Sequence, residues 1–287
     1  MEIKTVGVIG AGTMGNGIAH VLAKTGYEVV LVDIEQRFVD RGMQAIAKNM
    51  EREVVRQKLT AEQRELALKR IRPSISRRDL AGCDLVVEAA TERFEIKAEV
   101  FRDLETICRP EVILASNTSS ISITKLAGVT KKPGKIIGMH FFNPVPLMKL
   151  VEVILGLATS EETYQTVKAL AEKLGKTPVE VNDAPGFVSN RVLMPLINEA
   201  VYAVMEGVAT PEAVDEVFKL GMAHPMGPLT LADFIGLDVC LDIMRVLQSG
   251  LGDPKYRPCP LLIKMVDAGW LGCKSGRGFY RYDQPGA

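Results

Sequence analysis

Short apolar runs alternate with longer amphipathic ones through the first two-thirds of the chain. The short runs are rich in Val and Ile and end at Gly, Asp or Pro, which is typical of strands buried on both faces. Helical periodicity fills most of the gaps between them, for example at 13–25, 95–108 and 161–174. This alternation predicts a mostly parallel, doubly wound sheet with helices on both faces, an α/β fold. The predicted strands are 5–10, 27–33, 83–89, 111–116, 135–142, 149–154 and 177–182.

The pattern changes after the segment NDAPGF at 182–187. From Phe187 onward no clear strand pattern is present, and helical runs are separated by turn sequences rich in Pro and Gly. We therefore predict two domains, an α/β domain at 1–184 and an all-helical domain at 185–287. The helices predicted in the second domain are 187–206, 211–220, 229–249 and 260–268.

A long charged segment at 35–71 interrupts the alternation of strands and helices. Its pattern predicts two helices, with Thr60 as the N-cap of the second. We expect a helical hairpin inserted after the second strand.

Composition and charge narrow the class of protein. Lys+Arg and Asp+Glu both total 35, so the chain has no basic excess that would predict a nucleic-acid partner. The five cysteines form no CxxC pair, which predicts neither a metal site nor a disulfide scaffold and fits a reducing compartment. No apolar run reaches the roughly 18 residues of a membrane span, and no secretory signal pattern opens the chain. We expect a cytoplasmic protein without a membrane partner.

The first predicted strand leads into the glycine-rich sequence VIGAGTMGNGIA, in which Gly10, Gly12 and Gly15 have the spacing GxGxxG. In a strand–turn–helix context, the first glycine permits the tight turn and the second leaves room for a pyrophosphate. The third lets the helix pack closely on the strand. The pyrophosphate then meets free N–H groups at the start of the helix. A glycine turn without a ligand is the alternative, but this context favours a dinucleotide site.

The second predicted strand ends at Asp33. An acid at this place can accept hydrogen bonds from the adenosine ribose and repel a 2′-phosphate. Ile34 and Glu35 offer no cation for that phosphate, although Arg37 is close in sequence. The pattern predicts NAD rather than NADP as the cofactor. Asp33 could also cap the helix that follows it.

One of the three histidines, His140, lies in the apolar segment GMHFFNPVPLMKLVEVI together with Glu152. Imidazole is the usual acid/base group near pH 7, and ligands of open α/β sheets bind at the carboxyl ends of strands. A carboxylate on the neighbouring strand would orient the ring and stabilise its protonated form. Spacing alone leaves a buried structural histidine equally possible. His20, within the first predicted helix, is expected to be structural.

Taken together, these motifs resemble the L-3-hydroxyacyl-CoA dehydrogenase family, most closely its short bacterial members that act on 3-hydroxybutyryl-CoA. Six blocks occur in the family's order and cover essentially the whole chain. They are VIGAGTMGNGIA, ASNTSSISIT, GMHFFNPVPLMKLVEVI, DAPGFVSNRVLMPLINEA, HPMGPLTLADFIGLD and GWLGCKSGRGFY. The resemblance implies a Rossmann-type NAD-binding domain and reversible NAD-dependent oxidation of an (S)-3-hydroxyacyl-CoA to a 3-ketoacyl-CoA. It implies acetoacetyl-CoA and 3-hydroxybutyryl-CoA as the substrates, as in fatty acid or butyrate metabolism.

The resemblance also implies roles for individual residues. His140 matches the catalytic acid/base and Glu152 the acid that orients it. Ser119 matches a serine that contacts substrate near the nicotinamide, and Asn190 an asparagine that binds and polarises the substrate oxygen. Asn143 matches a further substrate contact. The implied cofactor-binding residues are Gly10, Gly12, Thr13, Met14, Gly15, Asp33, Glu92, Lys97, Asn117, Ser119 and Lys274.

Each role outside the glycine-rich turn has a structural alternative. Ser119 could cap the helix that follows it, and Asn190 could cap or bond locally at the start of its own helix. Glu92 and Lys97 could form a solvated pair at a helix end. Lys274 could be a surface lysine in a turn.

In the family, a similar hairpin folds over the CoA moiety and its lysines contact the CoA phosphates. Here Lys48, Arg52 and Arg56 stand near the expected positions, and arginine suits phosphate well. The interleaved Glu51 and Glu53 leave a solvated charged face as the alternative.

Two other functions share these motifs. One is an NAD-dependent dehydrogenase of a free hydroxy acid, of the gulonate type, which would not need the hairpin to bind CoA. The other is a non-catalytic, crystallin-like structural protein, against which the retention of His140, Glu152, Ser119 and Asn190 argues. The long apolar helices of the second domain predict a homodimer through that domain, because about 100 residues bury limited apolar surface alone.

Overall fold

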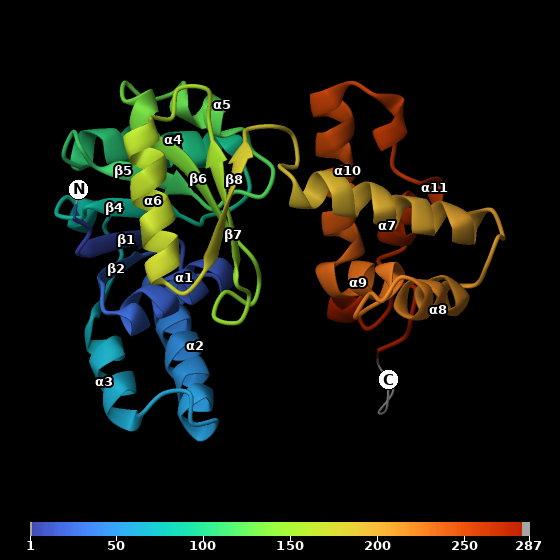
Figure 1. Cartoon of the computed structure of the whole chain (residues 1–287), viewed down its shortest axis with the longest axis horizontal. Coiled ribbons are helices and arrows are strands. Elements are labelled where there is room, and N and C mark those ends of the chain that lie inside the picture. The colour runs from blue at the N-terminus through green and yellow to red at the C-terminus, as the bar shows by residue number, and fades with distance from the viewer. Residues whose placement is uncertain (1, 283–287) are drawn as a thin grey trace. The chain divides into compact units, whose positions relative to one another are not determined.

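The computed structural model describes residues 2–282 and divides into two compact units, one ending at Ala184 and the other beginning at Pro185 (Figure 1). We call them the sheet unit and the helical unit. The elements of the sheet unit, in chain order, are β1 Thr5–Ile9, α1 Thr13–Thr25, β2 Glu28–Val32, α2 Gln36–Val55, α3 Ala61–Lys69, β3 Ile71–Ser74, β4 Leu85–Glu88, α4 Phe94–Ile107, β5 Ile113–Ser116, α5 Ile123–Ala127, β6 Ile136–Phe141, β7 Leu150–Leu155, α6 Glu161–Lys173 and β8 Thr177–Asn182.

The eight strands form one sheet in the order β3-β2-β1-β4-β5-β6-β7-β8. All neighbours run parallel except β6 and β7, which are antiparallel. The order reverses between β1 and β4, which is the topological switch point of a Rossmann-type sheet. The predicted mostly parallel, doubly wound fold is confirmed.

Strand β3 is missing from the sequence prediction. Its sequence IRPS buries only Ile71 and carries an arginine and a proline, so it has neither an apolar run nor an alternating pattern. Proline is tolerated there because β3 is at the edge of the sheet. The helix that was expected after Ser119 is present as the short α5.

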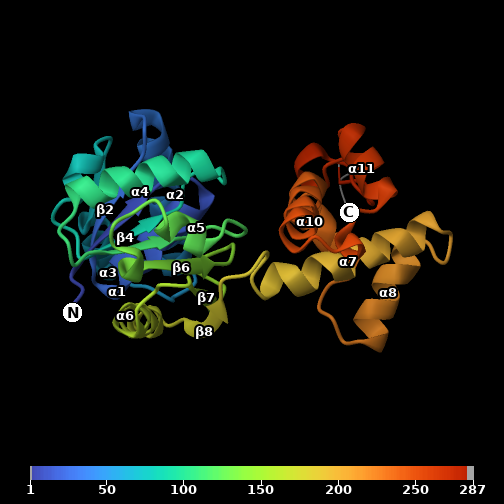
Figure 2. The same cartoon turned by 90° about the horizontal axis from the view of Figure 1, so that it is seen from above.

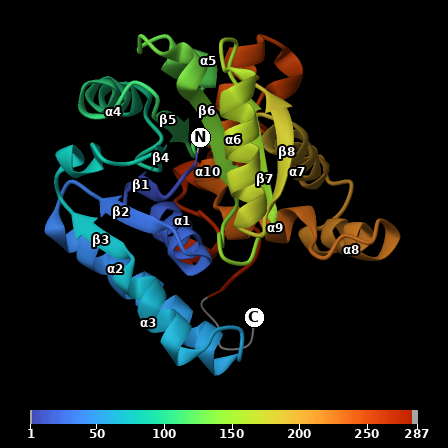
Figure 3. The same cartoon turned by 60° about the vertical axis from the view of Figure 1, so that its left-hand side comes forward.

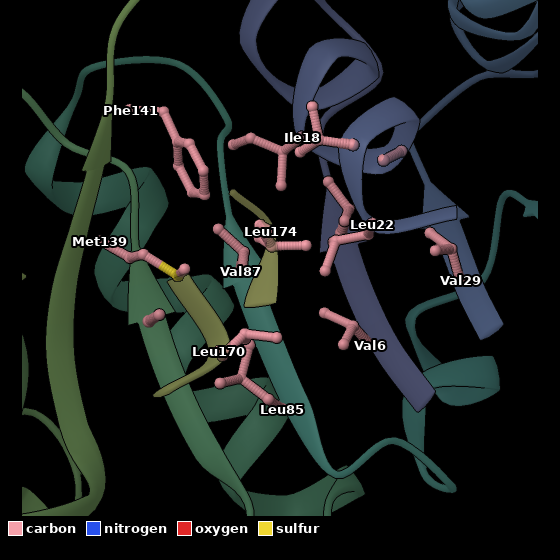
Figure 4. Packing of buried hydrophobic residues seen from close by; sticks show 14 of the residues in the cluster. Val6, Ile18, Leu22, Val29, Leu85, Val87, Met139, Phe141, Leu170 and Leu174 are labelled. Atoms are coloured by element: carbon pink, nitrogen blue, oxygen red, sulfur yellow. The ribbon is translucent and has the colours of Figure 1, made fainter. Parts of the chain in front are cut away.

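Helices cover both faces of the sheet, with α4 and α6 on opposite sides (Figure 2). On one face, side chains of α1 and α6 pack against residues that alternate along the strands (Figure 4). Met139 and Phe141 of β6 point into this core, together with Ile18 and Leu22 of α1. Successive strand residues point to opposite faces of the sheet. His140, which lies between Met139 and Phe141, therefore points to the face opposite this core.

The predicted helical hairpin is present as α2 and α3, which lie beside each other along α1 (Figure 3). Ile46 and Met50 of α2 are fully buried in the same core as α1. Thr60 caps α3 as predicted, since its hydroxyl accepts from the Gln63 amide and the Gln63 side chain accepts from the Thr60 amide.

The helical unit contains the helices α7 Ser189–Met205, α8 Pro211–Gly221, α9 Pro228–Ile235, α10 Leu237–Leu251 and α11 Pro260–Asp267. One predicted helix, 229–249, is wrong as a single element. It is broken at Gly236, whose φ of +104° cannot continue a right-handed helix. Within residues 2–282, no helix has both the length and the apolar character needed to cross a bilayer.

Candidate active site

The glycine-rich turn between β1 and α1 has the tight geometry that its sequence predicts. Gly10 has a φ of +94°, and a Cβ there would lie 2.6 Å from the Ala89 carbonyl oxygen. A Cβ on Gly15 would lie 1.7 Å from the Gly10 carbonyl oxygen, so α1 can start this close to β1 only with glycine at that position. A Cβ added to Gly12 would have no neighbour within 4 Å, so this side of the turn is open.

A cavity of about 570 Å³ opens beside the turn, at the carboxyl ends of the first strands. Its lining includes Gly10, Gly12, Asp33, Phe38 and Arg41. Gly12 caps α1 without a side-chain hydrogen bond, so the first N–H groups of the helix are presented toward an anion. The glycine-rich turn at 10–15, the cavity beside it and the free N–H groups of α1 form a site that we call the dinucleotide cradle. Its shape and its donors fit the pyrophosphate of a dinucleotide. The predicted cofactor residues Thr13 and Met14 open α1 beside this cradle.

Asp33 lies at the end of β2 and lines the same cavity. Its Oδ2 accepts from the Ala11 amide and its Oδ1 from the Ile34 amide, both at 2.7 Å. The alternative of a helix cap is wrong, because α2 has Glu35 as its N-cap residue. The carboxylate instead ties the glycine-rich turn to β2 and holds its oxygens at the cavity.

Arg37, the cation that sequence proximity indicated for the ribose site, is not among the residues that line the cavity. The Arg37 guanidinium pairs with Glu35 at 2.7 Å. Arg41, one helical turn beyond Phe38 on the same face of α2, lines the cavity instead. The i, i+3 spacing of these two residues was the available signal, and the sequence analysis missed it.

His140 and Glu152 face each other as direct partners in the antiparallel pairing of β6 with β7. The His140 Nδ1 lies 2.8 Å from Glu152 Oε2, and both side chains are buried. Since a carboxylate accepts, Nδ1 is the protonated nitrogen of the neutral ring. The expected contact between an imidazole and a carboxylate on adjacent strands is therefore present.

The period of two along each strand explains why apolar residues flank both polar ones. Val151 and Val153 belong to the core under α1 and α6, so Glu152 points to the opposite face of the sheet, as His140 does. Gly138 lies on that face, and a Cβ there would be 2.7 Å from the Ile154 Cβ. The imidazole also packs against the Phe142 ring, with centroids 4.7 Å apart. This environment restricts water around the pair.

The loop after β5 carries the predicted residues Asn117 and Ser119. The Asn117 side-chain oxygen accepts from the Phe141 amide at 2.9 Å, which ties the loop to the end of β6 beside His140. Ser119 does not cap the next helix, because Ser122 does so by accepting from the Lys125 amide. The capping alternative for Ser119 is wrong.

Glu92 holds the same loop. Its Oε1 accepts from the Ser119 amide at 2.9 Å, the Ser120 amide at 3.0 Å and the Thr118 hydroxyl at 2.6 Å. Lys97 is only 1% exposed and lies between Glu92 and Glu88, so the alternative of a solvated pair is wrong. The contacts of Glu92 and Lys97 with NAD stay predictions.

Glu88 is a residue that sequence reasoning missed. It is fully buried at the end of β4, and its carboxylate accepts from Lys97 at 2.8 Å and from the Ser116 hydroxyl at 2.7 Å. The available signal was an acid that ends an otherwise apolar strand in LVVE.

The remaining predicted site residues lie in less enclosed positions. Asn143 is exposed just after β6. In the helical unit, Asn190 is the second residue of α7, whose N-cap is Val188. Lys274 is not simply a surface lysine, since its Nζ donates to Asp238 Oδ2 at 2.6 Å. The substrate and cofactor contacts of these three residues stay predictions.

In the hairpin, two acidic side chains pair with cations of neighbouring helices and not with the basic candidates beside them in the sequence. Glu53 turns toward α1, where it pairs with Lys24 at 2.7 Å and contacts His20 at 3.2 Å. Burial lowers the pKa of His20 to about 4, so this histidine is neutral at pH 7 and Lys24 balances the carboxylate. Glu51 pairs with Arg64 of α3. The two acids on which the alternative of a solvated face rested are thus paired with cations of the same unit.

The three basic candidates of the hairpin remain exposed. Lys48, Arg52 and Arg56 are four residues apart, so they lie along one face of α2 and its C-cap. Within residues 2–282, none of the three side chains takes part in an ion pair. An anion therefore meets a stripe of uncompensated positive charge.

Comparison with known proteins identifies relatives over the whole chain. The family model for the 3-hydroxyacyl-CoA dehydrogenase NAD binding domain matches residues 5–184, and that for the C-terminal domain matches residues 186–282. The chain is 59% identical over 284 residues to a probable 3-hydroxybutyryl-CoA dehydrogenase of Bacillus subtilis, covering 99% of both proteins. It is 55% identical to a 3-hydroxybutyryl-CoA dehydrogenase of Bradyrhizobium diazoefficiens, covering 98% of this chain and 96% of that one.

A solved structure agrees with these matches. The crystal structure of (S)-3-hydroxybutyryl-CoA dehydrogenase from Ralstonia eutropha has a TM-score of 0.96 and 52% identity, covering 99% of this chain and all of the other. The resemblance predicted from the six ordered blocks is confirmed. With its NAD-binding domain and its C-terminal domain both matched, the chain belongs to the 3-hydroxyacyl-CoA dehydrogenase family.

Proposed function

We propose that this chain catalyses the reversible NAD-dependent oxidation of (S)-3-hydroxybutyryl-CoA to acetoacetyl-CoA. The observation that carries the proposal is the buried contact between His140 and Glu152, on the same sheet as the dinucleotide cradle. The names of the relatives support the four-carbon substrate. NAD, when bound, supplies the acceptor for the hydride that leaves C3 of the substrate.

The residues of the chain handle the proton and the substrate oxygens. In oxidation, His140 removes the C3 hydroxyl proton through Nε2, while Glu152 stabilises the imidazolium that forms. Ser119, Asn143 and Asn190 hold the substrate oxygens. In reduction, the protonated imidazole returns the proton to the 3-keto oxygen.

The same assay tests the proposal and its alternatives. We expect absorbance at 340 nm to fall when NADH and acetoacetyl-CoA are supplied, and to change far less with free acetoacetate or with NADPH. Equal rates with the free acid would favour a hydroxy-acid dehydrogenase of the gulonate type. No turnover with any of these substrates would favour a non-catalytic, crystallin-like protein.

We assign the expected preference for a thioester of CoA to the hairpin. We propose that Lys48, Arg52 and Arg56 bind the CoA phosphates, because charge-assisted hydrogen bonds to phosphate are strong and these cations lack acidic partners. Replacing all three by Gln should raise KM for acetoacetyl-CoA by at least about tenfold, since the loss of even one contact to a charged group costs about 1.5–3 kcal/mol. The value of kcat should change little.

Lys69→Gln provides a matched control for the hairpin variant. This lysine is exposed on α3, and its replacement removes one positive charge outside the stripe, as each single substitution of the triple variant does within it. KM should then stay at the wild-type value. An unchanged KM in the triple variant would contradict the CoA contacts without affecting the proposed oxidation chemistry.

We also propose that the chain forms a homodimer through the helical unit. Large apolar side chains on or next to α8 are strongly exposed: Val217 at 57%, Leu220 at 77% and Met222 at 57%. An exposed apolar cluster of this kind marks an interaction surface. Leu220→Asp should convert a dimer to a monomer in sedimentation velocity, whereas Leu157→Asp, at a 91% exposed position of the sheet unit, should leave the dimer intact. A monomeric wild-type chain would remove this proposal.

A further inference from the structure

We propose that Glu88 and Lys97 are positioning residues, which act through Glu92 to hold the Ser119 loop in the geometry that binds cofactor and substrate. The inference deepens the proposed function, because it assigns the support of a loop that this function uses. Neither Glu88 nor Lys97 needs to touch the reacting atoms.

The buried pair has a complete set of partners. Lys97 Nζ lies 2.8 Å from Glu88 Oε1 and 3.0 Å from Oε2, and it also donates to the Ala90 carbonyl oxygen at 3.2 Å. Glu88 further accepts from the Ala90 amide at 2.6 Å and from the Ser116 hydroxyl at 2.7 Å. The exposed fractions are 0% for Glu88 and 1% for Lys97, so a charge left without its partner here would be strongly destabilising.

Lys97 links this pair to the loop. Its ammonium lies 3.4 Å from Glu92 Oε2, while the other oxygen of Glu92, Oε1, faces the loop. That oxygen accepts from the amides of Ser119 and Ser120 and from the hydroxyls of Thr118, Ser119 and Ser120. One face of the Glu92 carboxylate is thus held by a buried cation and the other organises three consecutive residues.

The charge state of Glu92 decides whether the loop keeps these bonds, because a protonated carboxyl accepts fewer of them. Burial raises the pKa of Glu92, but the Lys97 charge and the loop donors outweigh it, so the pKa lies below its ordinary value. A carboxyl with a depressed pKa stabilises the folded loop at neutral pH, and this contribution is lost as the pH falls through the folded-state pKa.

Removing Lys97 should therefore raise the pH at which the loop is lost. Lys97 is the cation that lowers the pKa of Glu92, and its other acidic partner is Glu88 of β4. Lys125 of α5 lies over the Phe94 ring at the start of α4. An opposite charge at this distance typically lowers a carboxyl pKa by about one to three units. We expect the acidic limb of NADH binding to move upward by about one unit.

The experiment compares Glu88→Gln/Lys97→Met with wild type, because the double variant leaves no unpaired buried charge and should fold. We would measure the NADH dissociation constant by fluorescence from pH 4.5 to 8, together with the pH profile of kcat/KM for acetoacetyl-CoA. The double variant should unfold in urea near the wild-type midpoint. Its NADH affinity and kcat/KM should nevertheless be lost at a pH about one unit higher.

Two comparisons make the outcome decisive. Lys125→Met removes a cation that packs on the Phe94 ring at the start of α4, and its pH profiles should match the wild type. Wild-type profiles in the double variant would overturn the proposal, since Lys97 would then only neutralise Glu88. Because NADH binding is measured without turnover, a failure of the proposed substrate would show separately, as a wild-type chain that binds NADH but does not reduce acetoacetyl-CoA.

Discussion

Replacing His140 by alanine should lower kcat for acetoacetyl-CoA reduction by a factor of about 10² to 10⁴, the usual contribution of acid/base catalysis. The buried ring is the proposed proton donor, and Glu152 holds its Nδ1 at 2.8 Å. The NADH dissociation constant should stay near the wild-type value, because the ring is not among the residues that line the dinucleotide cavity. A variant with wild-type kcat would end the assignment of His140.

Glu152→Gln is the matched control for this substitution. It keeps the shape of the side chain and its hydrogen bond to the ring, but removes the negative charge that stabilises the imidazolium. We expect an intermediate loss of kcat, smaller than that of His140→Ala, with NADH affinity unchanged. The double variant should be no slower than His140→Ala alone, since residues that act as a unit are not additive. Additive losses would show that Glu152 acts independently of His140.

Gly15→Ala should weaken NADH binding by about 10²-fold or more, because the added Cβ would lie 1.7 Å from the Gly10 carbonyl oxygen. The turn must move away from α1 to relieve this contact, and displacements of about 1 Å in a binding site cost on the order of 10²-fold. The same strain should lower the melting temperature. The measurement is NADH titration by fluorescence alongside thermal unfolding.

Gly12→Ala separates strain from blocked access. No atom lies within 4 Å of the Cβ that it adds, so thermal unfolding should match the wild type. NADH binding should still weaken, because the methyl group fills the space through which the pyrophosphate approaches the backbone. Gly82→Ala, equally open but away from the cavity, should change neither property. Wild-type NADH affinity in Gly12→Ala would contradict the cradle.

Much of the sheet unit is predictable because the strand pattern is local. Buried parallel strands need apolar runs, so the central strands and the glycine-rich turn can be recognised in short stretches. β3 escapes this reasoning, since an edge strand with Arg72 and Pro73 needs no apolar run. The break at Gly236 escapes it as well, because a glycine within an apolar helical pattern does not reveal its φ.

The candidate site is less predictable, because its contacts join distant segments. Glu51 and Glu53 look like neighbours of the basic hairpin residues in sequence, yet they pair with cations on α3 and α1. Glu88 and Lys97 are nine residues apart, and no spacing rule relates them in the sequence. The end of β4 and the first turn of α4 bring the two side chains into contact. Because both side chains are buried, each charge needs the other as its partner, whereas charges on the surface would be solvated by water.

By itself, the sequence determined the family, the Rossmann-type architecture, the dinucleotide turn and the candidate acid/base pair, because each depends on residue types at fixed local spacing. Only the tertiary structure decided that His140 and Glu152 are direct partners. A register shift of one residue between β6 and β7 would have turned Glu152 to the opposite face. The tertiary structure also decided that Glu92 accepts hydrogen bonds from the Ser119 loop while Lys97 pairs with Glu88. Those contacts arise from the packing of separate strands and helices, and spacing along the chain does not encode which buried charges meet.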